Sequence, residues 1–239
     1  EGRETSEGVI GLALGAGAGA LVELACETDF VAKTEEFQKL AAALAAAALA
    51  DPRHATAEAL LEVKLDGEPA SARIQAAIAK LGENVVLRRV ARLAARGEGV
   101  VGGYVHAGGK LGVLVAVEGG SSGAGLEGLA KDLSMHVAAA DPSPVAVERS
   151  HVPKELVDAE RAIFRAQAEQ SGKPANIIEK MVEGRVNKYY AEVALLEQAF
   201  VKDPDRTVAR LLGDEGKRLG RELGVSGFVR FRLGEAAAK

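Results

Sequence analysis

The stretch that decides the fold is EGVIGLALGAGAGALVELACETDFVAKTEEFQKLAAALAAAALADP, residues 7–52, which recurs in outline as EGVVGGYVHAGGKLGVLVAVEGGSSGAGLEGLAKDLSMHVAAADP, residues 98–142. Similarity of this kind within one chain indicates a duplicated supersecondary unit. In each copy a short strand (9–14 or 100–106) passes through glycines into a second strand (20–25 or 112–117), and a helix then runs to Asp-Pro. Each copy is therefore predicted to be a β-hairpin followed by a helix.

A third strand completes each unit. Residues 81–93, LGENVVLRRVARL, resemble residues 223–233, LGVSGFVRFRL, and each stretch follows a helical pattern that stops near glycine. In the second stretch apolar and other residues alternate with a period of two, which is typical of a strand with one apolar face. The sequence thus predicts an α+β fold of two pseudo-repeated subdomains, each a small antiparallel sheet covered by helices.

A helical pattern without counterpart in the first copy is inserted into the second. Apolar residues recur at steps of four and three, first at Val152, Leu156, Ala159, Ile163 and Ala166, and after Ser171-Gly172-Lys173-Pro174 at Ile178, Val182, Val186, Tyr189 and Val193. This predicts an inserted antiparallel coiled-coil hairpin at 153–193, serving as a rigid arm or as a dimerisation surface. Core subdomain N then spans 1–97, and core subdomain C spans 98–152 and 194–239.

Composition and motifs argue against several classes of function. The chain has 239 residues, 48% of them hydrophobic, and 30 Lys and Arg against 34 Asp and Glu, so its net charge of -4 opposes direct nucleic-acid binding. One cysteine allows no intrachain disulfide, and the four histidines lack metal-ligand spacing. No phosphate-binding loop, nucleophile motif, signal peptide or membrane-length apolar run occurs, and the glycines at 15, 17 and 19 precede a strand rather than a helix. We therefore expect no enzyme, cofactor, metal or membrane role.

Two segments are candidate contact surfaces. Thr28, Asp29, Phe30 and Val31 sit at the strand-to-helix corner of the first copy, where function tends to concentrate. An equally good alternative is that Thr28 or Asp29 caps a helix and that Phe30 joins Phe37 in the core.

The second candidate segment is Met135-His136, in the helix of the second copy. The apolar stripe of that helix places Met135 nearly opposite the core and His136 at the stripe's edge, which suggests a contact surface. For a lone histidine, a hydrogen-bonded position half in the core is the commoner outcome.

The chain resembles the bacterial and organellar elongation factor Ts family. The resemblance lies in six ordered stretches: CETDFVAKTEEFQ (26–38), GGKLGVLV (108–115), MHVAAADP (135–142), QSGKPANIIEKMVEGR (170–185), LLEQAFVKD (195–203) and GFVRFRLGE (227–235). It covers nearly the whole chain. It implies guanine-nucleotide exchange on the GTPase elongation factor Tu, through two core subdomains and an inserted coiled-coil arm.

The resemblance also implies roles for individual residues. Phe30 would be a wedge entering the partner near its magnesium and switch region, with Asp29 beside it making polar contacts. Leu111, Gly112 and His136 would face the partner's phosphate loop, and Phe200-Val201 a different partner domain. The factor would favour the nucleotide-free form of elongation factor Tu, in the bacterial cytoplasm or an organellar matrix.

The sequence departs from the family pattern in places. The usual amino-terminal ubiquitin-associated-like domain and a carboxy-terminal module are not recognised, Ala25 stands where the family has Asn, and Lys202 where it has Met. The alternative function is a scaffolding or dimerisation protein built on the same α+β core.

Overall fold

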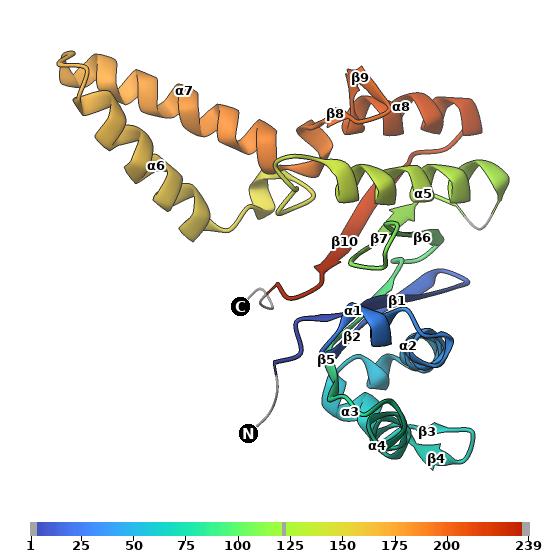
Figure 1. Cartoon of the computed structure of the whole chain (residues 1–239). Helices are drawn as coiled ribbons and strands as arrows, with labels where there is room; N and C mark the ends of the chain where they lie inside the picture. The colour runs from blue at the N-terminus through green and yellow to red at the C-terminus, as the bar shows by residue number, and fades with distance from the viewer. Residues whose placement is uncertain (1–3, 121–122, 236–239) are drawn as a thin grey trace. The chain divides into compact units, whose positions relative to one another are not determined.

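The structure, a computed structural model, describes residues 4–120 and 123–235, without the side chain of Ala124. The chain forms two compact units. Unit 1 comprises residues 1–138 and 223–239, and unit 2 comprises residues 139–222. Both sheet-and-helix repeats therefore fall in unit 1, and the inserted hairpin falls in unit 2. Figure 1 shows the elements of each unit.

The first repeat is a three-stranded antiparallel sheet in the order β1-β2-β5, formed by β1 (Glu7–Gly15), β2 (Ala18–Cys26) and β5 (Val85–Ala94). Every residue of the central strand β2 is buried. Gly17 turns the hairpin with φ of +66°, which glycine adopts at little cost. The remaining elements are α1 (Asp29–Ala32), α2 (Glu35–Ala50), η1 (Pro52–His54), α3 (Ala57–Leu61), β3 (Lys64–Leu65), β4 (Glu68–Pro69) and α4 (Ala70–Leu81).

The second repeat has the same antiparallel plan. Its sheet order is β10-β7-β6, from β6 (Gly99–Val105), β7 (Leu111–Glu118) and β10 (Gly224–Arg232), and its helix is α5 (Ala124–Ala139). The α+β class and the duplicated antiparallel sheets predicted from the sequence are thus confirmed.

Equivalent strands of the two repeats pack on each other. Strand β1 packs against β6, β2 against β7, and β5 against β10. A small apolar core joins the sheets: Ile10, Leu21, Val101, Leu114, Ala116 and Phe231. A Cβ on Gly112 would lie 2.5 Å from Cγ2 of Ile10, so the sheets approach closely because this position has no side chain.

The two covering helices, α2 and α5, also pack on their sheets in the same way. A Cβ on Gly11 of β1 would lie 2.7 Å from the carbonyl oxygen of Ala41 in α2. At the equivalent place in the second repeat, a Cβ on Gly102 would lie 2.5 Å from the carbonyl oxygen of Ala130 in α5. A glycine in the strand facing an alanine in the helix therefore sets the helix-to-sheet distance in both copies.

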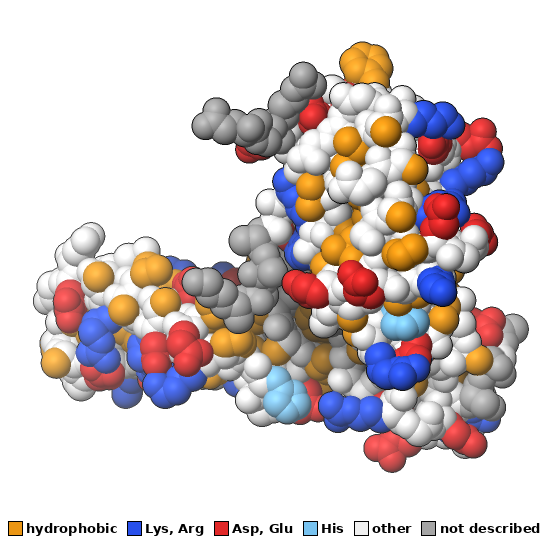
Figure 2. Space-filling view, turned by 90° about the horizontal axis from the view of Figure 1, so that it is seen from below, with side chains coloured by type: hydrophobic (Ala, Val, Ile, Leu, Met, Phe, Trp, Pro, Cys, Tyr) orange, Lys and Arg blue, Asp and Glu red, His pale blue; other side chains and the backbone are white. Residues whose placement is uncertain are grey.

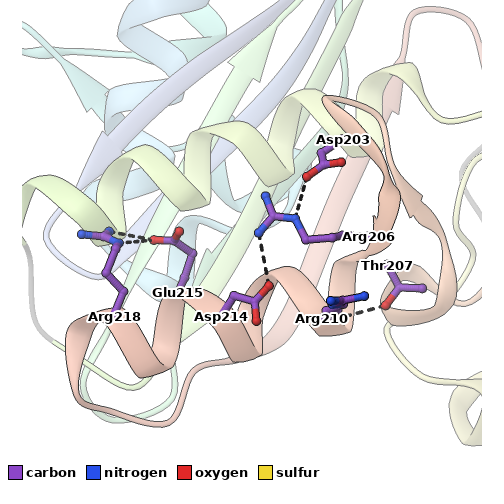
Figure 3. Close-up of polar contacts among 7 residues, drawn as sticks. All are labelled: Asp203, Arg206, Thr207, Arg210, Asp214, Glu215 and Arg218. Atoms are coloured by element: carbon purple, nitrogen blue, oxygen red, sulfur yellow. Dashed lines mark hydrogen bonds and ion pairs between the residues drawn. The ribbon is translucent and has the colours of Figure 1, made fainter.

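Unit 2 contains the helical hairpin of α6 (Lys154–Glu169) and α7 (Ala175–Val193), together with η2 (Arg149–His151), η3 (Leu195–Glu197), β8 (Ala199–Phe200), β9 (Asp203–Thr207) and α8 (Val208–Leu219). Figure 3 shows how polar contacts fix β9 on α8. Arg206 pairs with Asp203 at 2.6 Å and with Asp214 at 3.3 Å, while the Thr207 hydroxyl caps the helix by accepting from the backbone N–H of Arg210. None of the helices in the described ranges combines the length and apolarity needed to cross a bilayer.

The hairpin forms as predicted, but one of its predicted stripes faces the wrong way. Along α7, the inward residues Val182 and Val186 are buried as the spacing indicated. Along α6, it is Val157, Phe164 and Ala168 that pack inward, and the predicted stripe is exposed: Leu156, Ala159, Ile163 and Ala166. The prediction for α6 was wrong because two sets of apolar residues, offset by one position, both fit a helical period. Periodicity alone does not indicate which of the two sets packs inward.

Candidate functional site

The corner after β2 carries the most prominent exposed apolar side chain. Among the described residues, Phe30 is the large hydrophobic residue with the greatest exposure, at 81%. Its neighbour Val31 is buried, as is Phe37. The alternative in which Phe30 joins Phe37 in the core is therefore wrong, because α1 ends before α2 begins and the two rings do not share a helix face.

The cap expected at Thr28 does exist. Thr28 is the N-cap of α1, and its Oγ1 accepts a hydrogen bond from the Val31 N–H at 3.4 Å, a long and therefore weak bond. The Thr34 hydroxyl caps α2 by accepting from the Phe37 N–H. Capping and projection thus occur together, since the short helix that Thr28 caps is the one that carries Phe30 outward.

The corner is braced from the loop between α4 and β5. One carboxylate oxygen of Glu83 accepts from the backbone N–H groups of Thr28 at 3.0 Å and Glu27 at 3.2 Å, and the other accepts from the Thr28 hydroxyl at 2.6 Å. In return, the Glu27 carboxylate accepts from the Asn84 N–H at 2.8 Å. The Cys26 thiol donates to the Thr28 carbonyl at 3.2 Å, and its burial, with Glu83 nearby, raises the pKa of Cys26 to about 11.

Two ion pairs lie at or near Asp29, the residue before Phe30. Asp29 pairs with Lys33 at 2.6 Å, and this hydrogen bond lowers the pKa of Asp29. Lys110, in the β6–β7 turn, pairs with Glu7 at 2.7 Å, which raises the pKa of Lys110, and its charge also acts on Asp29. An exposed apolar side chain with charged residues beside it has the make-up of a protein-binding patch, which combines an apolar centre with a polar rim.

The corresponding connection in the second repeat is shorter and differs in sequence. Helix α2 begins at Glu35 after β2 ends at Cys26, whereas α5 begins at Ala124 after β7 ends at Glu118, and the shorter connection reads Gly-Gly-Ser-Ser-Gly. Two copies with the same helix packing thus differ at this connection, and only the first carries an aromatic residue there.

The other predicted contact residues of unit 1 are less exposed. Leu111 and Gly112 are buried in β7, and Met135 is half-buried. His136 is fully buried rather than at the edge of a stripe, because α5 is buried over a broad face that also includes Ser134. These positions have packing roles in the structure, and their contact with a partner stays a prediction.

In unit 2, the predicted pair at β8 is split between core and surface. Phe200 is buried, with 4% exposure, and Val201 is 39% exposed.

Glu27 and Glu83 were not identified from the sequence as part of the site. The signal was available in the antiparallel pairing of the predicted strands, which places the residues after Cys26 opposite those before Val85. In the part of the chain that the structure describes, no three His, Cys, Asp or Glu side chains form a metal-binding group.

Fold and site together define a duplicated α+β protein that presents a braced aromatic side chain at one corner. The sequence profile of the family described as "Elongation factor TS" matches residues 27–235. Proteins named elongation factor Ts from Thioalkalivibrio sulfidiphilus and Chromobacterium violaceum are each 47% identical to the whole chain, over 77% and 76% of their own lengths. The homologue from Brucella ovis is 43% identical, again over the whole chain and 78% of its own length. The chain belongs to the elongation factor Ts family, whose members serve translation elongation.

Proposed function

We propose that this chain is a guanine-nucleotide exchange factor that releases GDP from elongation factor Tu, with Phe30 as the wedge. The observation that carries the proposal is the 81% exposure of a phenylalanine that closely follows a backbone segment held by Glu83. Its family supplies the partner and the reaction class, and no bond is made or broken. We place the activity in the bacterial cytoplasm or an organellar matrix.

The mechanism is differential binding. Burying a phenylalanine side chain contributes about 1.5–3 kcal/mol, which suffices to favour one state of a partner at least tenfold. If Phe30 is buried only by the nucleotide-free form of elongation factor Tu, the factor stabilises that form, and by linkage GDP weakens factor binding equally. A wedge that displaces magnesium ligands and turns phosphate-loop amides away removes the charge stabilisation of the GDP phosphates.

The remaining predicted contacts extend this proposal. Asp29 offers a carboxylate beside the wedge, and the exposed part of Val201 offers an apolar contact to a second partner domain. Leu111, Gly112 and His136 are buried, so we propose that they act by fixing the surface presented to the phosphate-loop side.

The test is release of fluorescent GDP from elongation factor Tu, followed by stopped flow with substoichiometric factor. The parent chain accelerates release through many turnovers. Phe30→Ala slows release at least about tenfold, or ~1.4 kcal/mol, with an unchanged melting temperature. Val145→Ala is the matched control because Val145 is also exposed, at 42%, and this variant exchanges like the parent. Parental exchange by Phe30→Ala rejects the wedge.

A second candidate is self-association through the hairpin. Leu156, Ile163, Ile177 and Met181 are each at least 36% exposed, and Figure 2 shows hydrophobic side chains on the hairpin face that it views, flanked by charged ones. In antiparallel helices both exposed rows lie one residue before the inward rows and so face the same side. One apolar face on a two-helix arm suits a homodimer, and a chain that only dimerises would not accelerate GDP release.

A further inference from the structure

Helix α1 is too short to hold its own shape. It has four residues, and an isolated helix of that length is unstable in water because nucleation costs more than its few hydrogen bonds return. Its local side-chain bonds are weak: the Thr28 cap is 3.4 Å long, and the Asp29–Lys33 pair is exposed to solvent. Something outside residues 28–33 must therefore keep Phe30 in place.

Burial of Val31 and Ala32 in the first core supplies the apolar part of that restraint, and Glu83 supplies a polar part. It follows Gly82, which ends α4 with φ of +73°, and it precedes the start of β5 at Val85. Since Val85 pairs with Cys26 in the antiparallel sheet, residues 83 and 84 lie opposite residues 28 and 27. Three hydrogen bonds from Glu27 and Thr28 converge on the Glu83 carboxylate, and charged acceptors make such bonds roughly twice as strong as neutral ones.

The restraint acts on backbone groups directly before the projecting ring. The N–H groups of residues 27 and 28 are held by Glu83, which restrains the first turn of α1. The ring therefore projects from a restrained backbone before any partner arrives. A preordered contact residue avoids an ordering cost on binding. The exposed ring of Phe30 thus depends for its orientation on a half-buried carboxylate more than fifty residues away in the sequence.

We propose that Glu83 is a positioning residue for nucleotide exchange, holding Phe30 in its docking orientation through the N–H groups of Glu27 and Thr28. This inference rests on the proposed function. Glu83 does not touch the partner itself, and its effect passes through α1.

The test combines substitutions at Glu83 and Phe30. Glu83→Ala slows GDP release from elongation factor Tu about tenfold, while Glu83→Gln largely preserves it, because the amide oxygen still accepts from the two N–H groups and the amide nitrogen donates to the Thr28 hydroxyl. The double variant Phe30→Ala/Glu83→Ala is no slower than Phe30→Ala alone, since Glu83 acts only through the ring. Glu118→Ala is the control, because Glu118 also binds a backbone N–H, that of Arg96 at 2.6 Å, away from α1.

Hydrogen exchange separates positioning from general stability. In Glu83→Ala, the amides of Glu27 and Thr28 exchange at least tenfold faster, while amides in the middle of β5 keep parental protection. Uniform loss of protection across β5 overturns the inference, as do additive rate effects in the double variant. Parental release by Glu83→Ala beside slow release by Phe30→Ala rejects the role of Glu83 alone. Parental release by Phe30→Ala rejects the proposed wedge and this inference together.

Discussion

The carboxylate of Glu23, in the central strand of the first sheet, accepts a hydrogen bond from Nε of Arg89 at 2.5 Å, and Glu23 is fully buried. The pair also joins the two repeats. Glu23 accepts from the Gly234 N–H at 2.9 Å, Arg89 donates to the Arg232 carbonyl at 2.7 Å, and its guanidinium lies 4.3 Å from the centroid of the Phe231 ring. Arg88 also lies within ion-pair distance of Glu23, at 3.7 Å. The end of β10 is thus fastened to the first sheet by Glu23 and Arg89.

Breaking this pair should be costly. Glu23→Ala leaves the guanidinium of Arg89, a side chain only 13% exposed, without its carboxylate partner, and we expect the free energy of unfolding to fall by about 3–5 kcal/mol in urea titrations. Replacing both partners with apolar residues, Glu23→Leu/Arg89→Met, should recover much of that loss because no charge is left buried. A double variant as unstable as the single one would contradict the account.

The buried thiol predicts a specific pH dependence. The pKa of Cys26 is raised from 9.0 to about 11 by burial first and by Glu83 second, so the folded state holds the proton more tightly than the unfolded state. Its contribution to stability is fully present below pH 9 and is lost as the pH rises through about 11. The melting-temperature advantage of the parent over Cys26→Ala should therefore shrink between these pH values. An advantage that stays constant would show that the thiol titrates normally.

The surroundings of two glycines predict that a Gly→Ala substitution changes stability in opposite directions at the two positions. Gly102→Ala forces a Cβ against the Ala130 backbone, and we expect a loss of about 1–3 kcal/mol. Gly128→Ala, in α5, meets nothing within 4 Å and should stabilise the chain by up to about 1 kcal/mol, because alanine favours the helix. Thermal unfolding of the two variants measures both, and equal shifts would refute the close helix-to-sheet contact.

The hairpin predicts a concentration-dependent dimer. Ile163 is 50% exposed in the apolar row of α6, so Ile163→Glu should shift the chain to monomer in analytical ultracentrifugation. Ala162→Glu adds the same charge at an exposed position about 100° around α6 from Ile163, outside the apolar row, and should leave association unchanged. A monomeric parent at high micromolar concentration would remove this role from the hairpin.

Much of this molecule could be predicted from the sequence, because the duplication fixes the order of strands and helices without any long-range information. The internal match of residues 7–52 with 98–142 placed both hairpins and both covering helices. Which face of a helix is buried was harder to predict. The exposed row of α6 and the burial of His136 depend on which of two adjacent faces finds a packing surface, and spacing along one helix does not contain that information.

The candidate site was only partly predictable for a similar reason. Thr28 and Phe30 stand out locally, as a cap and an aromatic residue at a corner. Glu83 stands out only once β2 and β5 are paired in register, because its hydrogen bonds cross the sheet rather than follow the chain. Local sequence patterns do not identify residues that support a site from a distant part of the chain.

The shared seating of α2 on Gly11 and of α5 on Gly102 has a consequence for engineering. Because the two copies pack their helices on the sheet in the same way, the segment that connects strand to helix in one copy can be exchanged for that of the other. Transplanting the Thr28–Lys33 segment into the second copy would place a second phenylalanine ahead of α5, where Val225 stands at the position equivalent to Glu83. Such a chain would separate the contribution of the segment itself from that of its original surroundings.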